Sequence, residues 1–340
     1  MAAAKTKLII DVDTGIDDAL ALLHACASPE ADILGVTTVS GNVDLRRATR
    51  NTRAVLALAG RGDIPVWPGC ARPILREAQD ASYVHGGSGL GQAELPDPPP
   101  ARDERHAVDQ ILALAKAHQG ELVLVPTGPL TNIAAAVTRE PALVKWVKRL
   151  VLMGGSFQGG GNTTPAAEFN IWHDPEAARI VFNAFAQEDA APLVAVGLDV
   201  TQKVLLLPEQ IAALGRRIAH TPRGPALARF FDDATRDYFD FIEKRLGQRF
   251  FVMHDPLAVA AALDPSLIET QRVTVDIETT GALTSGMTVA DWRGVWKRKP
   301  NVEVATGVRA EAAIAQFLER MERLAGKSLL PREAGEGDRA

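Results

Sequence analysis

Short apolar runs alternate with segments of helical periodicity through the first two hundred residues. The apolar runs are rich in β-branched residues and end at turn residues such as Gly and Asn, which is typical of buried strands. We expect strands at 8–12, 33–40, 64–67, 122–128, 150–155 and 193–200. We expect the intervening helices at 19–24, 43–59, 104–118, 129–136 and 174–182. This alternation predicts an α/β fold with an open, mostly parallel sheet flanked by helices on both faces.

The pattern changes in the last third of the chain. Residues 208–263 are mostly helical, and 310–325 read as a final amphipathic helix. A few extra antiparallel strands are predicted in between, at 272–278, 287–292 and 302–306. The Gly- and Pro-rich segment 68–102 predicts a long loop, which in a compact domain is usually functional or disordered. Because no linker separates two domains, we expect one domain over 1–326 and a polar, disordered tail over 327–340.

Four carboxylates are crowded where the first predicted strand passes into the first helix. Residues 11–18 read DVDTGIDD, which places Asp11, Asp13, Asp17 and Asp18 at this junction. In an open α/β sheet, the carboxyl end of a strand is the usual position of a ligand. Helix capping explains Asp17 and Asp18 at most. A hard divalent cation with oxygen ligands would offset the repulsion among all four acids, so we favour a metal site.

Other predicted strands of the sheet also end in polar residues or glycines. The carboxyl ends of parallel strands meet at one edge of a sheet, so we expect these residues to line a single pocket. They are Asn42, Thr127, Met153 and, in the loop that follows, Asn162, Glu168 and Asn170. Such a pocket is rich in amides and acceptors and poor in Lys and Arg. It suits an uncharged, polyhydroxylated ligand such as a sugar better than a phosphate.

Composition narrows the function class. The chain has 46% hydrophobic and 23% charged residues and a net charge of −5, which is typical of a soluble globular protein and argues against a nucleic-acid binder. Cys26 and Cys70 are too few for a disulfide framework and read as reduced thiols. No signal-like segment and no run long enough to span a bilayer is visible, so we expect a cytoplasmic protein without a membrane partner.

Six blocks now carry a resemblance to a known family. Residues 11–18 resemble the D-x-D-P-G-x-D-D signature of the nucleoside hydrolases, with Thr14 in place of the Pro of many relatives. The further blocks follow in the family's order: TTVSGN at 37–42, VPTGPLTN at 125–132, VLMGG at 151–155, AEFN at 167–170 with DPEAA at 174–178, and HDP at 254–256. The chain is therefore similar to inosine-uridine preferring nucleoside N-ribohydrolases, and the resemblance implies their Rossmann-like fold.

The resemblance also implies functional roles for individual residues. It implies a Ca²⁺ site made by Asp13, Asp18, Asp255 and the main-chain carbonyl of Thr127, all of them hard oxygen ligands. Asp13 would take the proton from a calcium-bound water. The ribose hydroxyls would be held by Asp17, Asn162, Glu168, Asn170 and Asp255, with Asp11 and Asn42 as supporting neighbours. The expected reaction is hydrolysis of the N-glycosidic bond of a purine or pyrimidine ribonucleoside to free base and ribose, in nucleoside salvage.

Other expected site residues are less constrained by the sequence. His254, beside Asp255, is the expected acid for the departing base, although a His before Asp-Pro can equally begin a helix. His85, in its Gly-rich loop, either contacts the nucleoside or caps a turn. Met153 and Phe169 are expected to pack against the sugar, and core filling is the alternative. No role is predicted for Trp172 or His173, and the base preference is expected to be mixed.

Two alternative functions stay open. The opening DVDTG also resembles the signature of haloacid-dehalogenase-type magnesium phosphatases, in which Asp11 would be the nucleophile, but this leaves Glu168 and Asn170 unexplained. A non-catalytic, calcium-dependent nucleoside or sugar binder would have a similar pocket. The family resemblance further implies a homo-oligomer, a tetramer or a dimer, without identifying the contact surface.

Overall fold

The main sheet is the scaffold of the fold in the computed structural model, which describes residues 4–98, 103 and 105–327. Within these residues the sheet has eight strands in the order β3-β2-β1-β4-β5-β6-β12-β9. They are β1 (Thr6–Val12), β2 (Ala31–Thr38), β3 (Val66–Pro68), β4 (Leu122–Pro126), β5 (Arg149–Met153), β6 (Leu193–Val196), β9 (Ile268–Val273) and β12 (Val302–Val308). All neighbouring pairs are parallel except β12 and β9, which are antiparallel at one edge.

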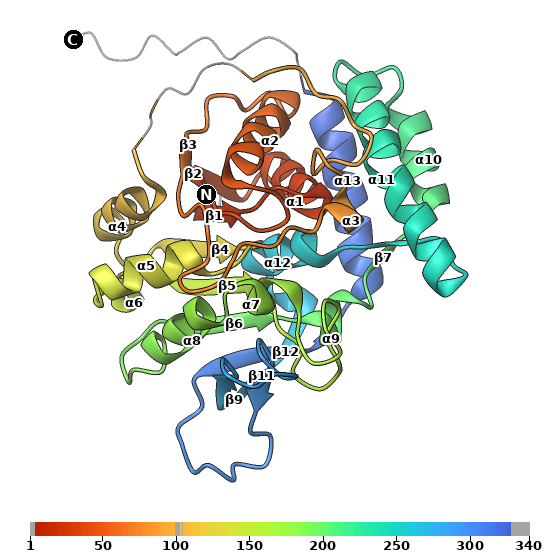
Figure 1. Ribbon diagram of the computed structural model, residues 1–340. Coiled ribbons are helices and arrows are strands. Elements are labelled where there is room, and N and C mark those ends of the chain that lie inside the picture. Colours follow the sequence, from red (N-terminus) through yellow and green to blue (C-terminus); the bar gives the residue numbers. More distant parts are fainter. Residues whose placement is uncertain (1–3, 99–102, 104, 328–340) are drawn as a thin grey trace, which may run out of the picture.

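Helices cover both faces of this sheet (Figure 1). The first hydrophobic core includes residues of α1 (Ile16–Ala27), α2 (Leu45–Leu58), α10 (Pro208–Ile218), α11 (Gly224–Leu246), α12 (His254–Leu263) and α13 (Ala310–Ala325). The second includes residues of α4 (Ala107–Ala117), α5 (Thr131–Arg139), α6 (Leu143–Trp146), α7 (Phe169–His173) and α8 (Pro175–Ala184). Alternate residues of β1 enter different cores: Ile10 packs in the first and Ile9 in the second. The predicted α/β class and the parallel sheet between two helical layers are confirmed.

Short elements complete the fold and carry parts of the site. They are α3 (Ser82–His85), α9 (Leu198–Thr201), the 3₁₀ turn η1 (Pro265–Leu267), and the antiparallel pairs β7 (Leu205–Leu206) with β8 (Phe251–Val252) and β10 (Val275–Ile277) with β11 (Thr288–Ala290). The β10–β11 pair confirms the extra antiparallel strands predicted at 272–278 and 287–292. The strand predicted at 302–306 is β12 of the main sheet, which is antiparallel to β9 and parallel to β6. The predicted strand at 193–200 is wrong in its second half, because the chain turns at Gly197 into the one-turn helix α9.

Two sequence predictions concern segments at the limits of the described chain. The loop predicted at 68–102 contains the one-turn helix α3, so its described part is not wholly irregular. The tail predicted at 327–340 lies outside the described residues except for Lys327, whose Nζ donates to the backbone oxygen of Cys26 at 2.9 Å.

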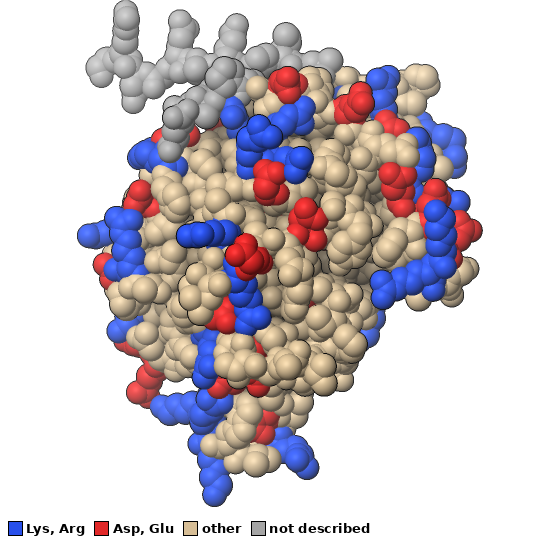
Figure 2. Space-filling model, viewed as in Figure 1, with Lys and Arg blue, Asp and Glu red and all other residues tan. Residues whose placement is uncertain are grey.

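Both signs of charge are interspersed on the face shown in Figure 2. No helix in the described part of the chain is long and apolar enough to cross a membrane.

Candidate active site

A cavity of about 440 Å³ opens at the carboxyl ends of the parallel strands. Thr127 follows β4 and Met153 ends β5, as the convergence of strand ends predicts. Eleven of the expected residues line this cavity: Asp17, Asn42, His85, Thr127, Met153, Asn162, Glu168, Phe169, Asn170, His254 and Asp255. Its size is in the range of small-molecule sites.

Asp13 lies behind the cavity and is fully buried. Its Oδ2 accepts a hydrogen bond from the backbone N–H of Asn42 at 2.6 Å, whereas its Oδ1 has no hydrogen-bond partner. A Cβ on Gly41 would lie only 2.0 Å from Oδ2, so this close approach requires glycine. Burial, with the nearby charge of Asp18, raises the pKa of Asp13 well above its usual value. A buried carboxylate oxygen without a partner is a position where a cation or a proton fits.

Asp17, Asp18 and Asp255 each offer an oxygen within 4.8 Å of the others. Burial is the largest cause that raises the pKa of Asp17 and Asp18 to about 6 and the pKa of Asp255 in the same direction. Removal from water and mutual repulsion both disfavour the three negative charges, and a divalent cation would offset both effects. These residues can therefore hold a metal ion. This group of three contains Asp17, whereas the set of metal ligands expected from the sequence contains Asp13 instead.

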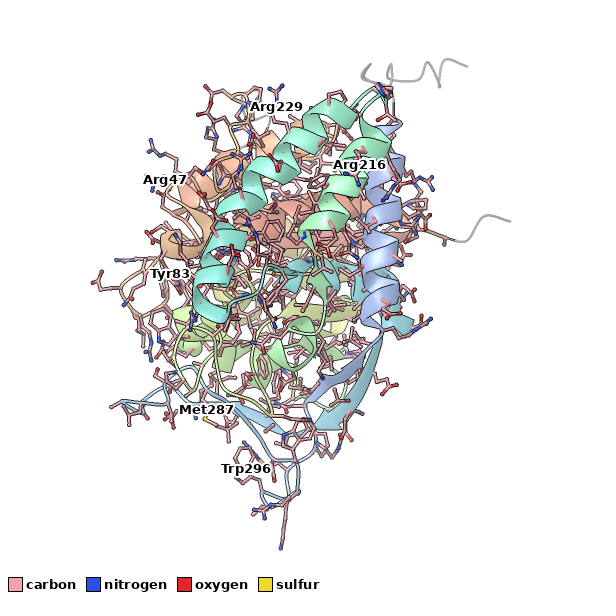
Figure 3. The ribbon with its side chains drawn as sticks, turned by 90° about the vertical axis from the view of Figure 1, so that its right-hand side faces the viewer. Arg47, Tyr83, Arg216, Arg229, Met287 and Trp296 are labelled. Atoms are coloured by element: carbon pink, nitrogen blue, oxygen red, sulfur yellow. The ribbon has the colours of Figure 1, made fainter. Side chains whose placement is uncertain are left out.

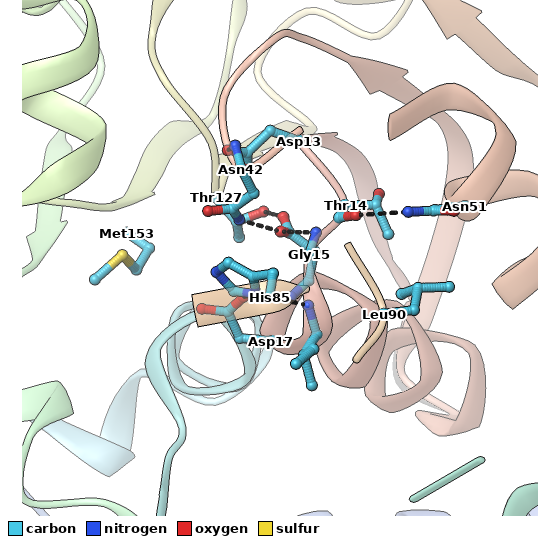
Figure 4. Close-up of polar contacts among 12 residues, drawn as sticks. Asp13, Thr14, Gly15, Asp17, Asn42, Asn51, His85, Leu90, Thr127 and Met153 are labelled. Carbon is cyan, nitrogen blue, oxygen red and sulfur yellow. Dashed lines mark hydrogen bonds and ion pairs between the residues drawn. The ribbon is translucent and has the colours of Figure 1, made fainter. Parts of the chain in front are cut away.

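Asp18 also has the capping function that was the alternative to metal binding. Its Oδ2 accepts from the backbone N–H of Gly15 at 2.9 Å at the start of α1. Its Oδ1 accepts from the Thr127 hydroxyl at 2.7 Å. The carbonyl of Thr127 in turn accepts from Asn170 Nδ2 at 2.6 Å. Capping and metal binding are compatible, because each carboxylate oxygen can accept more than one contact. Figure 4 shows Gly15 and Thr127, with Asp13 and Asn42 close to Thr127.

Another part of the cavity lining is built on the first turn of α7. Glu168 caps this helix: its Oε1 accepts from the N–H of Asn170 at 2.9 Å, and its Oε2 accepts from those of Gly155 and Ile171 at 2.9 and 3.2 Å. Asn162 Oδ1 accepts from the N–H of Phe169 at 3.0 Å. Two of the side chains that the sequence assigned to the sugar, Glu168 and Asn162, are thus fixed in position by backbone hydrogen bonds.

His85 reaches the cavity from α3. Its Nδ1 accepts a hydrogen bond from the backbone N–H of Ile16 at 3.1 Å and lies 3.9 Å from Asp17 Oδ1. Because Nδ1 is the acceptor, the proton of the neutral ring is on Nε2. Burial lowers the pKa of His85 to about 4, against the opposing charge of Asp18. His85 therefore caps the start of α1 and lines the pocket, and its contact with a nucleoside stays a prediction.

His254 is the first residue of α12 and also lines the cavity. Its Nδ1 lies 2.8 Å from the Thr201 hydroxyl, which leaves Nε2 as the ring nitrogen for the cavity. Burial, with the neighbouring His85, lowers the pKa of His254 to about 4. Its ring is therefore neutral near pH 7 and offers at most one N–H to the cavity.

Part of an apolar wall of the cavity was missed in the sequence, in which the family resemblance indicated only 238–243, before His254, as a helix facing the base. Its members are Tyr238, Phe241, Ile242 and Leu246 of α11, Phe250 and Phe251 at β8, and Tyr83 and Val84 of α3. In Figure 3 the labelled Tyr83 lies beside the C-terminal part of α11. The i, i+3, i+4 spacing of 238, 241 and 242 was a readable signal of one apolar face, but core packing explains such a face equally well. Thr201 was also not predicted as a functional residue, because the sequence predicted a strand over 193–200 and not the short helix α9.

Asp11 does not line the cavity. It is 1% exposed, and its Oδ1 accepts from the Thr37 hydroxyl at 2.6 Å and from Asn132 Nδ2 at 2.8 Å. The supporting role that the resemblance implies for Asp11 stays a prediction, because neither of these partners lines the cavity. The position does not suit the nucleophile of the phosphatase alternative.

The parallel sheet and the carboxylate pocket at its carboxyl edge define an α/β enzyme site with the capacity for a metal ion. The family model described as inosine-uridine preferring nucleoside hydrolase matches residues 8–315, and the chain belongs to this family. Its members include ribonucleoside hydrolases, which are N-glycosyl hydrolases. The family resemblance inferred from the six sequence blocks is thus confirmed.

Individual relatives match over almost their whole length. The inosine-uridine preferring nucleoside hydrolase of Leishmania major is 40% identical over 94% of this chain and 98% of its own. The pyrimidine-specific ribonucleoside hydrolase RihA of Photobacterium profundum is 38% identical over 92% and 98%. The solved structure of a purine-preferring ribonucleoside hydrolase from Gardnerella vaginalis superposes with a TM-score of 0.86 at 34% identity, covering 94% of this chain and 99% of its own. Three relatives of similar identity thus carry names with three different base preferences.

Proposed function

We propose that this protein hydrolyses the N-glycosidic bond of ribonucleosides to a free base and ribose. The proposal depends on one observation. Carboxylates form one part of the site, here called the carboxylate floor (Asp17, Asp18 and Asp255), and apolar side chains line another part of the same cavity. The floor suits the hydroxyls of a ribose and the wall suits a flat heterocyclic base, so the two parts of a nucleoside fit the two parts of the cavity. The family of the chain agrees with this assignment.

The proposed cofactor is Ca²⁺. Asp18, Asp255 and the carbonyl of Thr127 would hold it together with Asp13, whose Oδ1 lacks a partner. Asp17 is close enough to join them. All these donors are hard oxygen ligands, as calcium prefers. When bound, the cation supplies a fixed positive charge that lowers the pKa of a water beside the sugar.

The remaining groups would bind and polarise the sugar. In this proposal Asp13 takes the proton of the attacking water, and Asp17, Asn162, Glu168, Asn170 and Asp255 hold the ribose hydroxyls. Cleavage builds positive charge on the ribose ring, and preorganised carboxylates stabilise that charge. Met153 and Phe169 pack against the sugar. His254 donates its Nε2–H to the departing base, and the Nε2–H of His85 is a second donor to the nucleoside.

The preference for the base is proposed to be mixed. Phe241, Ile242 and Leu246 of α11 contact a ring by area and do not distinguish its hydrogen-bonding edges, and the polar side chains of the same helix that line the cavity are Tyr238 and Arg245. We further propose a homo-oligomer, a tetramer or a dimer, in the cytoplasm. Exposed Leu283 and Val295 are available for subunit contacts, and the free thiols of Cys26 and Cys70 are consistent with a reducing compartment.

The test is hydrolysis of inosine and of uridine, each with and without EDTA, followed by release of reducing sugar. Release that chelation abolishes and Ca²⁺ restores is the expected result. The ratio of the two rates measures the base preference. Asp13→Ala is the matched variant, and it should bind nucleoside without cleaving it. Binding without cleavage by the wild type would overturn the enzyme assignment in favour of the binder, and cleavage of a phosphate ester instead would favour the phosphatase.

A further inference from the structure

Thr201 holds His254 from outside the cavity. The Thr201 side chain is fully buried, and its Oγ1 lies 2.8 Å from Nδ1 of His254. Thr201 is not among the residues that line the cavity, so a bound nucleoside would not touch it. The hydroxyl of Thr201 can therefore act on the reaction only indirectly, and the imidazole of His254 is the cavity group that it contacts.

The backbone around Thr201 is fixed relative to His254. The N–H of Leu198, at the start of α9, donates to the carbonyl of Gly155 at 2.8 Å, and the N–H of Val204 donates to the carbonyl of Thr201 at 3.0 Å. The N–H of Met253 then donates to the carbonyl of Val204 at 2.9 Å.

The β7–β8 pair continues this link. Leu205 lies opposite Val252, and Leu206 lies opposite Phe251. This two-residue ribbon sets the register between the segment that follows β6 and the segment that precedes α12. The ribbon thereby places the hydroxyl of Thr201 beside the ring of His254.

A threonine hydroxyl suits this position because it can both donate and accept a hydrogen bond. When it donates to Nδ1 of the neutral ring, the proton of the imidazole is on Nε2. Valine has nearly the same shape but no hydroxyl. With valine, Nδ1 would be a buried acceptor without a partner, and the ring could rotate or adopt the other tautomer.

We propose that Thr201 is a positioning residue, which orients His254 and selects the tautomer whose Nε2–H points at the departing base. The inference rests on the proposed nucleoside hydrolysis and adds to it a residue that never contacts the substrate. The hydrogen bond from Nε2 stabilises the negative charge that develops on the base as the bond to the ribose breaks.

A comparison of two leaving groups distinguishes a positioning role of Thr201 from a structural one. A structural defect would impair cleavage of both substrates equally. A purine or pyrimidine is a poor leaving group unless its charge is stabilised by a hydrogen-bond donor. The 4-nitrophenolate of a 4-nitrophenyl riboside is already a stable anion and leaves without that help. Loss of the Thr201 hydroxyl should therefore impair cleavage of inosine much more than cleavage of the nitrophenyl riboside.

The experiment compares the Ca²⁺-loaded wild type with Thr201→Val, Thr201→Ser, His254→Gln and the Thr201→Val/His254→Gln double variant on both substrates. For Thr201→Val we expect kcat on inosine to fall about 10- to 100-fold with KM changed less than about threefold. Its kcat on the nitrophenyl riboside should change less than about threefold. Thr201→Ser keeps the hydroxyl and should stay close to the wild type. In the His254→Gln background, Thr201→Val should have no further effect on inosine.

Each other outcome overturns the inference. An equal loss on both substrates, or a loss that adds to that of His254→Gln, would show that Thr201 acts on the fold or on another group. Unchanged activity on inosine would show that the hydroxyl does not matter. Failure of the proposed function itself is recognised separately, because the wild type would then cleave neither riboside.

Discussion

The Nδ1 atom of His85 accepts a hydrogen bond from the backbone N–H of Ile16 at 3.1 Å, so a side chain of the pocket also caps α1. The ring is 7% exposed, and water cannot readily replace this acceptor. The first backbone N–H of the helix that carries Asp17 and Asp18 is thus hydrogen-bonded to an imidazole from α3. A substitution of His85 therefore changes both the stability of the fold and the lining of the cavity.

Replacing His85 should therefore destabilise the protein. In His85→Ala the N–H of Ile16 loses its acceptor, and we expect the free energy of unfolding to fall by about 1–3 kcal/mol. Urea denaturation measures the change. Tyr83→Ala is the matched control from the same helix, because Tyr83 is 59% exposed, and it should stay within about 0.5 kcal/mol of the wild type. Equal stability of the two variants would contradict the capping role.

Stability should depend on pH through His24, which is 1% exposed and packs edge-on against Phe317 with 5.8 Å between ring centroids. Burial lowers the pKa of His24 from 6.5 to about 4. The unfolded chain therefore binds the proton more readily than the folded one. The contribution of the neutral ring is fully present above pH 6.5 and is lost as the pH falls from about 6.5 to about 4.

The expected loss from this one group is about 3 kcal/mol by pH 4. It is measured as the difference in unfolding free energy between wild type and His24→Gln at pH 7.5 and at pH 4.5, since other titrating groups cancel in this difference. The wild type should lose more stability than the variant on acidification. Parallel pH profiles of the two proteins would refute the assignment.

Metal removal should destabilise the wild type and reveal the repulsion among the carboxylates. A cation at 100 times its Kd raises the free energy of unfolding by about 2.7 kcal/mol. Asp255→Asn removes one charge of the Asp17, Asp18 and Asp255 trio. In EDTA this variant should melt at a higher temperature than the wild type, and Ca²⁺ should no longer raise its Tm. A variant less stable than the wild type in EDTA would show that repulsion is not the dominant effect.

The α11 wall should affect binding of the base without affecting binding of the sugar. We expect Phe241→Ala to raise KM for inosine about tenfold, because it removes apolar contact area near the mouth of the cavity. Inhibition by free ribose should be unchanged. The control is Lys244→Ala, an exposed position of the same helix that does not line the cavity. Weaker ribose inhibition in Phe241→Ala would mean that Phe241 supports the sugar subsite instead.

The sequence was most informative where one local pattern determines one local structure. Apolar runs ending in polar residues predicted which strand ends meet, and Asn42, Thr127 and Met153 indeed line one cavity. The sequence could not show that His85 caps α1, because its partner is a backbone group sixty-nine positions away. The partnership of Thr201 with His254 depends on the β7–β8 register, which has no local signature in two-residue strands.

The carboxylate floor also has a consequence for chains whose synthesis is not complete. Asp18 comes from the first helix and Asp255 from α12, so a cation bound between them would close most of the polypeptide into a loop without a covalent bond. A chain whose synthesis stops before Asp255 lacks part of that cross-link but still carries the acids of its first helix. Truncated copies should therefore be readily unfolded and degraded, and the site itself would distinguish finished molecules from unfinished ones.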